Sequence, residues 1–178
     1  MTIYDAKGNV LDPSTIDYSK GRLEQAEDGR MVYYKWSEKP VTDDPDEMYK
    51  LKHAELSKRC NEIITAGVDV DLSTGPEHFS LTEHDQLNLF GKQAQLAAGA
   101  QQLEYHEDGA PCKFYSAEDM GAIIEAVTYF VSFNVTYCNS LFTWLRACTT
   151  AAEMAQIEYG EEIPEEYQSE VYKAYINV

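Results

Sequence analysis

The residues of this chain whose types and spacing are suited to chemistry are few and scattered. Asp69, Asp71 and Ser73 alternate like the first ligands of a calcium-binding loop, in which acidic oxygens surround the ion. The glycine that such a loop needs at its sixth position is displaced to Gly75, and Ser80 stands where the twelfth position needs a glutamate. We therefore expect a strand with outward carboxylates here rather than a calcium site.

The other candidates for catalysis or metal binding are equally weak. No two of the histidines, His53, His78, His84 and His106, have the HxxH or HxxxH spacing of a zinc site. The chain contains no GxSxG, P-loop or GxGxxG motif. An enzyme acting on cell-wall glycan through paired carboxylates, such as Glu161 and Glu165, has no support beyond a charged loop. We predict no catalytic residues, no metal, no cofactor and no enzymatic activity.

The cysteines predict buried thiols rather than disulfides. The chain contains Cys60, Cys112, Cys138 and Cys148, and none forms a CxxC pair. Cys138 and Cys148 lie on one expected helix, about 15 Å apart by helical rise, which is too far for a bridge. Both fall on its apolar face, where a free cysteine behaves as a small hydrophobic residue. This usage is typical of a chain made in a reducing compartment.

The charge balance excludes several classes of partner. The 178 residues include 31 acidic and 14 basic ones, which gives a formal net charge of −17. Nucleic acid is repelled, because its binding needs basic groups that displace counterions from phosphates. Anionic membrane surfaces are repelled in the same way. No basic start followed by an apolar run is visible at the N-terminus, so we expect no signal peptide, and we predict neither a nucleic-acid nor a membrane partner.

The dominant structural element is expected over residues 117–148. Apolar residues recur there at steps of three and four, the pattern of a helix with a wide apolar face. Such a helix would be about 48 Å long, so it must pack along most of its length, on helices of the same chain or on copies of itself. Its seam consists of Ile124, Val127, Val131, Asn134, Cys138, Leu141 and Leu145.

Polar residues within this segment argue against a membrane span and raise the question of what Asn134 contacts. The segment has the length of a membrane span, but it carries Thr128, Ser132 and other polar residues that hydrocarbon would not tolerate unsatisfied. Asn134 lies on the seam itself. A polar residue at such a position fixes register or oligomer order in some coiled coils. The alternative is an intrachain hydrogen bond inside a bundle.

Residues 1–40 have the pattern of two β-hairpins. The first turns at Lys7-Gly8-Asn9, and the second turns at Glu27-Asp28-Gly29-Arg30, where Asp-Gly favours a type I′ turn. Hairpins this small rarely stand alone, so they must dock on the rest of the chain or on a partner. The expected docking residues are Tyr4, Tyr33, Tyr34 and Trp36.

The remainder, residues 45–178, is expected to be a helical domain with inserted hairpins. Capping pairs such as Thr82 with Asp85 and Thr150 with Glu153 mark helix starts, and Gly67 ends the first helix. The helix that follows Thr82 is expected to bury Leu87, Phe90, Ala94, Leu96 and Ala97. The sequence thus predicts an α+β fold, mainly α: a helical bundle with one long helix, small β-hairpins and an N-terminal β-hairpin arm.

Several stretches also resemble a known family. They are His78–Leu89, Tyr105–Gly109 with Cys112–Met120, Thr136–Leu141, and Ile157–Gly160 with Ile163–Glu165. In this order they resemble uncharacterised proteins of bacteriophages and prophages of Gram-positive gut bacteria, which are similar to a domain of unknown function in phage tail and tail-fibre proteins. The resemblance covers about residues 45–170. The family has no assigned catalytic residues to carry over.

The resemblance implies a structural component of a bacteriophage tail, near the baseplate or the fibre attachment region. It implies a protein made in the host cytoplasm and located in the virion, with other tail, baseplate or fibre proteins as partners. Several copies per virion are expected, because tail tips have threefold or sixfold symmetry. Residues 1–40 would form the docking arm. The alternatives are a tail-fibre assembly chaperone that is absent from finished particles, and an adhesin whose acidic face binds a host surface polymer.

Overall fold

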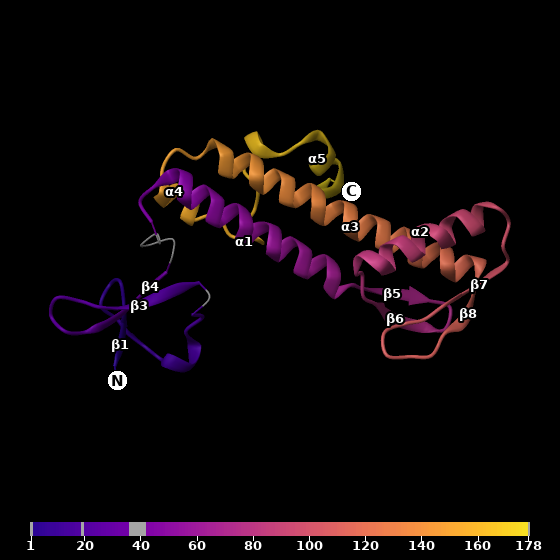
Figure 1. Ribbon diagram of the computed structural model, residues 1–178, viewed down its shortest axis with the longest axis horizontal. Coiled ribbons are helices and arrows are strands. Elements are labelled where there is room, and N and C mark those ends of the chain that lie inside the picture. The colour runs from indigo at the N-terminus through magenta and orange to yellow at the C-terminus, as the bar shows by residue number, and fades with distance from the viewer. Residues whose placement is uncertain (1, 19, 36–41, 178) are drawn as a thin grey trace. The chain divides into compact units, whose positions relative to one another are not determined.

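The structure of the chain is a computed structural model, which describes residues 2–18, 20–35 and 42–177. The fold is α+β, as the sequence predicts, with 51% of the described residues in helices and 20% in strands. Figure 1 labels its elements along the chain.

The chain divides into two compact units. Unit 1 combines Met1–Leu56 with Leu141–Tyr167, and unit 2 combines Ser57–Ser140 with Gln168–Val178. The two longest helices, α1 (Pro45–Ala66) and α3 (Ala117–Ala147), contribute residues to each unit. The expected division into an arm of residues 1–40 and a domain of residues 45–178 stays a prediction.

Unit 1 begins with a four-stranded sheet. Its strands are β1 (Ile3–Asp5), β2 (Val10–Leu11), β3 (Gly21–Gln25) and β4 (Met31–Lys35). Strands β1 and β2 pair antiparallel, as do β3 and β4, so both expected hairpins are present. In addition, β1 pairs with β4 in parallel, with Tyr4 opposite Val32, which gives the order β2-β1-β4-β3. This parallel pairing joins the hairpins into one sheet.

Both hairpins turn through the same kind of three-residue loop. In the second, the Gly29 N–H donates to the Ala26 carbonyl at 2.8 Å, and the Ala26 N–H donates to the Arg30 carbonyl at 2.8 Å. The third loop residue is left-handed, with φ of 83° at Gly29 and 89° at Gly8, whereas Asp28 has a negative φ. This is a type I turn closed by a left-handed glycine. The expected type I′ turn is wrong, because it needs positive φ at both central residues.

The helical part of unit 1 is built from segments distant in sequence. It combines the first half of α1, the last residues of α3, the short helix α4 (Ala151–Ala155) and a 3₁₀ turn at Glu165–Tyr167. His53 of α1 stacks on Phe142 of α3, with ring centroids 4.1 Å apart. The buried core residues here are Met48, Leu56, Leu141, Leu145, Ala151, Met154, Ala155, Ile157 and Ile163.

Unit 2 contains two hairpins and the helices that cover its core. Its further elements are β5 (Val68–Leu72), β6 (Gly75–Phe79), α2 (Glu83–Ala97), β7 (Gln102–Tyr105), β8 (Lys113–Ser116) and α5 (Glu170–Ile176). Strands β5 and β6 pair antiparallel, as do β7 and β8, and the two hairpins lie together in Figure 1. The Phe79 ring contacts those of Tyr105 and Tyr115, so an aromatic cluster joins the hairpins.

Local signals place most helix ends where the sequence predicts them. The Asp44 carboxylate accepts from the Asp46 N–H at 2.9 Å, at the start of α1. Thr82 with Asp85 forms a complete capping box for α2, and Thr150 with Glu153 forms one for α4. A 3₁₀ turn over Glu165–Tyr167 precedes α5, and Ser169 caps that helix.

Gly67 shows why α1 must end where it does. Its φ is 94°, a conformation that other residues rarely adopt. A Cβ atom at this position would lie 2.1 Å from the Phe79 carbonyl oxygen of β6. The glycine therefore ends the helix and also lets the β5–β6 hairpin fold back against it.

The face of α2 that the sequence expects to be buried points outward, so this prediction is wrong. Leu87 is 66% exposed and Phe90 is 69% exposed, and Ala94 and Ala97 are also exposed. The core of unit 2 takes Leu89 from the opposite face of the helix. Apolar periodicity located an apolar face correctly but could not say whether this chain covers it.

The long helix α3 runs over 31 residues, one residue short of the expected end. Ser116 caps its start, where the Asp119 N–H donates to Ser116 Oγ at 3.0 Å. Tyr172 and Tyr175 of α5 pack their rings on Phe133 of α3 in unit 2. In the described ranges of the chain, no helix combines the length and apolar content that a membrane crossing requires.

Candidate functional site

The N-terminal sheet presents two chemically different faces. Because side chains alternate along a strand, Val32 and Tyr34 of β4 point to one face and Tyr33 and Lys35 point to the other. The register places Tyr4 of β1 beside Val32. We call the side of Tyr4 and Tyr34 the open face, and the side of Tyr33 the packed face.

The packed face is covered by the segment between β2 and β3. Ile3 and Tyr33 are buried there. The Tyr33 hydroxyl donates to the Asp17 carbonyl at 2.5 Å, and the Tyr18 ring meets the Tyr33 ring edge-on. These contacts hold the segment against the sheet and make Tyr33 a core residue.

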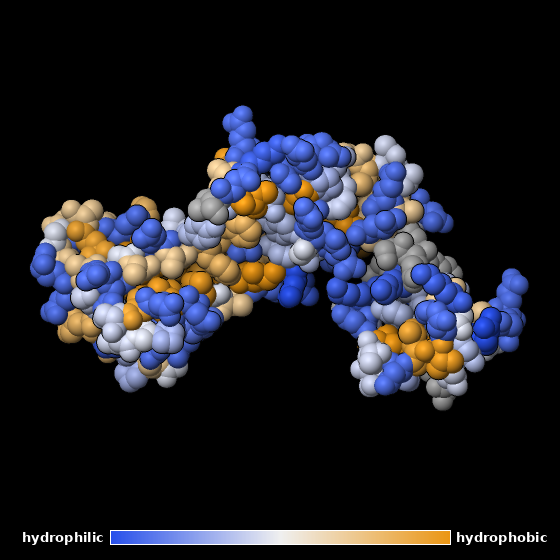
Figure 2. All heavy atoms as spheres, turned by 180° about the vertical axis from the view of Figure 1, so that it is seen from behind, coloured by the Kyte–Doolittle hydropathy of each residue, from blue (hydrophilic) through white to orange (hydrophobic). Residues whose placement is uncertain are grey.

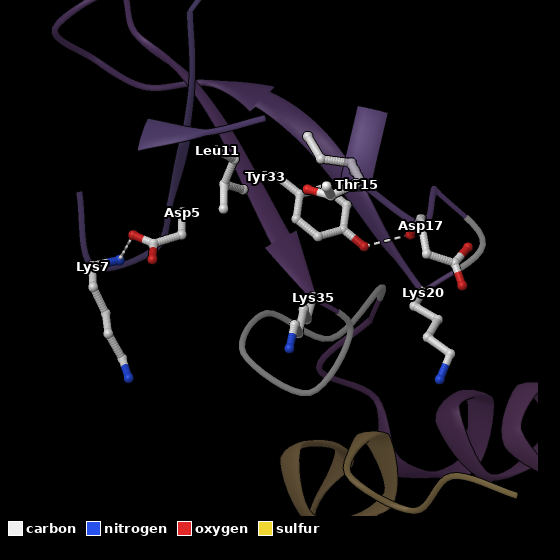
Figure 3. Close-up of a pocket in the computed structure, with 9 residues that line it drawn as sticks. Asp5, Lys7, Leu11, Thr15, Asp17, Lys20, Tyr33 and Lys35 are labelled. Atoms are coloured by element: carbon white, nitrogen blue, oxygen red, sulfur yellow. Dashed lines mark hydrogen bonds between the residues drawn. The ribbon is translucent and has the colours of Figure 1, made fainter. Parts of the chain in front are cut away.

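A pocket of about 450 Å³ lies on the packed face (Figure 3). Its lining residues are Asp5, Lys7, Leu11, Thr15, Ile16, Asp17, Lys20, Tyr33 and Lys35. Figure 3 shows the side chains of Lys7, Lys20 and Lys35 extending in one direction from its rim. The pocket therefore combines the Tyr33 ring with three lysine amino groups.

Asp5 and Lys20, two charged residues of this pocket, are held by other residues of unit 1. Hydrogen bonds from Asn9, the largest from its side-chain amide, hold the pKa of Asp5 below its ordinary value. Lys20 Nζ lies 2.8 Å from Glu158 Oε2 within unit 1, and this exposed hydrogen-bonded pair raises the pKa of Lys20. Asp5 therefore serves to fix the first turn.

The open face carries two aromatic side chains that are partly exposed. Tyr4 and Tyr34 are both half-buried. The Arg30 guanidinium lies over the Tyr4 ring, 5.2 Å from its centroid, and Arg22 is directly opposite Tyr34 in the strand register. Buried Val32 lies next to Tyr4. This face thus offers two tyrosines with arginines beside them.

The segment that forms the sheet is also nearly neutral, in contrast to the chain as a whole. Residues 1–35 contain six acidic and five basic residues, whereas the remaining 143 residues contain 25 acidic and nine basic ones. A surface near neutrality does not repel another protein, while the rest of this chain repels acidic surfaces.

The structure divides the residues that the sequence names for docking. Tyr4 and Tyr34 lie on the open face, whereas Tyr33 belongs to the packed face and its ring is buried. A buried ring serves the packing of its own unit, so Tyr33 is not a surface contact. Trp36 lies outside the described residues.

The seam residues of α3 lie mainly inside the chain. Six of the seven, Ile124, Val127, Asn134, Cys138, Leu141 and Leu145, are buried, and Val131 is half-buried. Asn134 Nδ2 donates to the Phe130 carbonyl at 2.8 Å, one helical turn earlier. The Asn134 carbonyl accepts from Cys60 Sγ of α1 at 3.6 Å. Asn134, the polar residue of the seam, thus forms its hydrogen bonds within this chain.

The cysteines lie in two kinds of environment. All four are free thiols, and buried Cys60 and Cys138 lie next to each other in unit 2. The contact with Cys60 and burial both raise the pKa of the Cys138 thiol, and burial raises that of Cys148. Thiols with a raised pKa are poor nucleophiles, so these two cysteines act as packing residues.

The alternating acidic residues of β5 do not gather around one point. Ser73 is turned away from them, because its N–H and hydroxyl both donate to the Asp119 carboxylate, at 2.9 and 2.8 Å. Asp69 instead contacts His78. In the residues that the structure describes, no three His, Cys, Asp or Glu side chains are grouped as metal ligands.

His78 links three segments of unit 2 through its imidazole ring. Its Nδ1 lies 2.7 Å from Asp69 Oδ1, its Nε2 lies 2.8 Å from the Ala66 carbonyl, and Asp108 is 4.0 Å away. Both ring nitrogens face acceptors, which favours the doubly protonated imidazolium. The hydrogen bond to Asp69, followed by that to Ala66, raises the pKa of His78 above 6.5.

We expect replacement of His78 by glutamine to destabilise the protein in acid but not in base. A raised folded-state pKa gives stability that is complete below 6.5 and lost as the pH rises through the raised value. Since the side chain is 44% exposed, the effect should not exceed about 0.5 kcal/mol. Urea unfolding of both proteins at about pH 5.5 and about pH 9 measures it. A His78 pKa at or below 6.5, from an NMR titration, would contradict this arrangement.

Glu77 is the site residue that sequence reasoning missed. Its side chain is only 7% exposed, and its carboxylate accepts from Lys113 Nζ at 2.6 Å, the Tyr115 hydroxyl at 2.6 Å and Thr74 Oγ1 at 3.0 Å. The group joins β6 to β8. Nothing in the local sequence signals it, because its main partners lie on the other hairpin.

No family model, no curated protein and no solved structure matches this chain. Its function must therefore be inferred from the faces of the sheet, the packing of the helices and the sequence pattern.

Proposed function

We propose that this chain is a structural protein without catalytic activity, which docks on a partner protein through the open face of its N-terminal sheet. Following the sequence resemblance, the partner is a tail, baseplate or fibre protein of a bacteriophage, and the chain is part of the virion tail. The supporting observation is the pair of tyrosines, Tyr4 and Tyr34, on a nearly neutral sheet within a very acidic chain.

The chemistry of the open face suits protein contact. A tyrosine combines a large apolar ring with a hydroxyl that hydrogen-bonds at the rim, and tyrosine and arginine are enriched in interfaces. Tyr4 already carries Arg30 over its ring, so this tyrosine is partly ordered before binding. Prior ordering lowers the entropy lost on association.

The rest of the chain is proposed to serve as the body that the sheet anchors. In this proposal, the helices form a bundle around α3, and the N-terminal sheet is a docking arm. The excess of acidic residues outside the sheet keeps the body soluble and discourages random association. Several copies per virion would then present this body to a fibre or to the medium.

The double variant Tyr4→Ala/Tyr34→Ala should lower incorporation into particles at least ~10-fold, because truncating an interface tyrosine often costs about 2 kcal/mol or more. The measurement is quantitative mass spectrometry of purified virions after complementation of a phage that lacks the gene. Phe114→Ala, which removes an exposed aromatic ring from β8, is the control and should be incorporated normally.

Three results would contradict the proposal. Unchanged incorporation of the double variant would mean that the open face is not the docking surface. Absence of the chain from finished virions, with defective fibres when it is deleted, would identify an assembly chaperone instead. Release of cell-wall glycan by the purified chain would replace the structural role with an enzymatic one.

A further inference from the structure

A second apolar surface lies on α2. Leu87, Gly91, Ala94 and Ala98, the C-cap residue, follow one another at steps of four and three, and Phe90 is three residues after Leu87; we call these five residues the α2 stripe. All five are exposed, and they lie on the side of the helix opposite the buried Leu89. Figure 2, a view from behind, shows that apolar side chains also reach the surface elsewhere on the molecule among hydrophilic ones.

A groove continues from the α2 stripe into unit 2. It has a volume of about 260 Å³ and runs between α2 and α3, with Leu89 and Phe90 on one side and Ile124, Val127 and Val131 on the other. The remaining lining residues are uncharged polar ones. Phe90 belongs to both the stripe and the groove, so the two form one continuous apolar surface.

Gly91 has no evident role within its own chain. It lies in the middle of α2, where glycine is destabilising relative to alanine. Its φ is not positive, and a Cβ atom there would meet no other atom within 4 Å. A glycine in an exposed helix leaves room for the close approach of a second backbone, and at Gly91 this space is open.

The distribution of charged residues indicates which molecule binds at the α2 stripe. Residues 86–103 contain no acidic residue and only one basic residue, Lys92, in a chain with 31 acidic residues. Lys92 itself pairs with Glu104 at 2.6 Å. Two copies of a chain with a net charge of −17 repel each other wherever acidic residues face. A basic partner would be drawn to the acidic surfaces instead, whereas a second copy can approach only along a neutral one.

We infer that the α2 stripe is a self-association surface, on which a second copy of this chain binds through its own α2 stripe. A two-fold interface uses the same patch on both copies, so an apolar, uncharged helix face is complementary to itself. Gly91 and Ala94 let the two helices approach closely, and Phe90 of each copy enters the groove between α2 and α3 of the other.

Sedimentation equilibrium of the full chain tests this inference. The wild type should be a dimer, and Phe90→Glu should raise its dissociation constant at least ~100-fold, because a charge replaces a central ring. Val171→Glu is the control, since Val171 is 57% exposed on α5 and its substitution adds the same charge elsewhere. Added salt should tighten the dimer by screening the repulsion between two acidic chains.

The site of contact is tested with a photo-cross-linking amino acid, p-benzoylphenylalanine, in place of Phe90. Cross-links between copies should map to α2 or to the groove side of α3. A monomeric wild type at millimolar concentration, a dimer that Phe90→Glu leaves intact, or cross-links to other elements would each overturn the inference. The Tyr4→Ala/Tyr34→Ala variant should remain dimeric, so failure of the docking proposal is distinguishable from failure of this one.

Discussion

Replacing Glu77 with alanine is expected to destabilise unit 2 by about 2–4 kcal/mol, because it removes a buried carboxylate that holds several donors. Lys113 is partly exposed and can return to water, but the Tyr115 hydroxyl is buried and would lose its acceptor. Most of the loss should therefore come from Tyr115 and from the cavity left between β6 and β8. Urea unfolding followed by far-UV circular dichroism measures it.

Matched variants separate this cause from a general loss of charge. Glu125→Ala, on an exposed position of α3, should change stability by less than about 0.5 kcal/mol. Tyr115→Phe removes the hydroxyl that loses its acceptor in Glu77→Ala. The double variant should therefore lose less free energy of unfolding than the sum of the losses in the two single variants. Strict additivity in this cycle would show that the 2.6 Å contact contributes nothing.

Glu77 should also make the stability of the protein depend on pH in the acidic range. Burial alone raises the pKa of Glu77, but the hydrogen bonds from Lys113, Tyr115 and Thr74 outweigh it and bring the pKa below its ordinary value of 4.5. A lowered folded-state pKa gives stability that is present above 4.5 and lost as the pH falls through the lower value. The stability difference between wild type and Glu77→Gln should therefore shrink in that acidic range.

The elements that sequence reasoning placed correctly are those with local causes. Capping residues, such as Thr82 with Asp85, and glycines, such as Gly67, act within a few residues of the ends that they define. The hairpins follow from the alternation of the strands and from the glycines in their loops. The type of turn at Gly29 was missed, because it depends on the strand register, which a dipeptide does not determine.

Features that depend on distant contacts were not predictable from the same patterns. The parallel pairing of β1 with β4 and the partners of Glu77 both join segments more than 20 residues apart. The α2 stripe shows a different limit. The sequence correctly predicts an apolar face there. The same periodicity would be seen whether that face is buried by its own chain or by another molecule. The burial of Tyr33 likewise depends on the segment that contains Asp17.

The second large effect is expected at the seam of α3, where Leu145→Ala should destabilise unit 1 by about 3–4 kcal/mol. The Leu145 side chain is fully buried, and its removal leaves a cavity in a core that also contains Leu141, Met154 and Ile157. Such cores relax only partly around a deleted group, so the loss of apolar burial and the cavity both contribute. Thermal and urea unfolding of the variant measure the change.

Leu51→Ala is the matched control, because it makes the same truncation in the same unit at a position of α1 that is 45% exposed. It should cost less than about 1 kcal/mol, since little apolar surface is lost and no cavity forms. Leu145→Ala should leave the oligomeric state unchanged, whereas Phe90→Glu should alter it without affecting the core. If Leu145→Ala dissociated the protein at unchanged stability, the seam would be an interface between copies, the alternative that its periodicity alone leaves open.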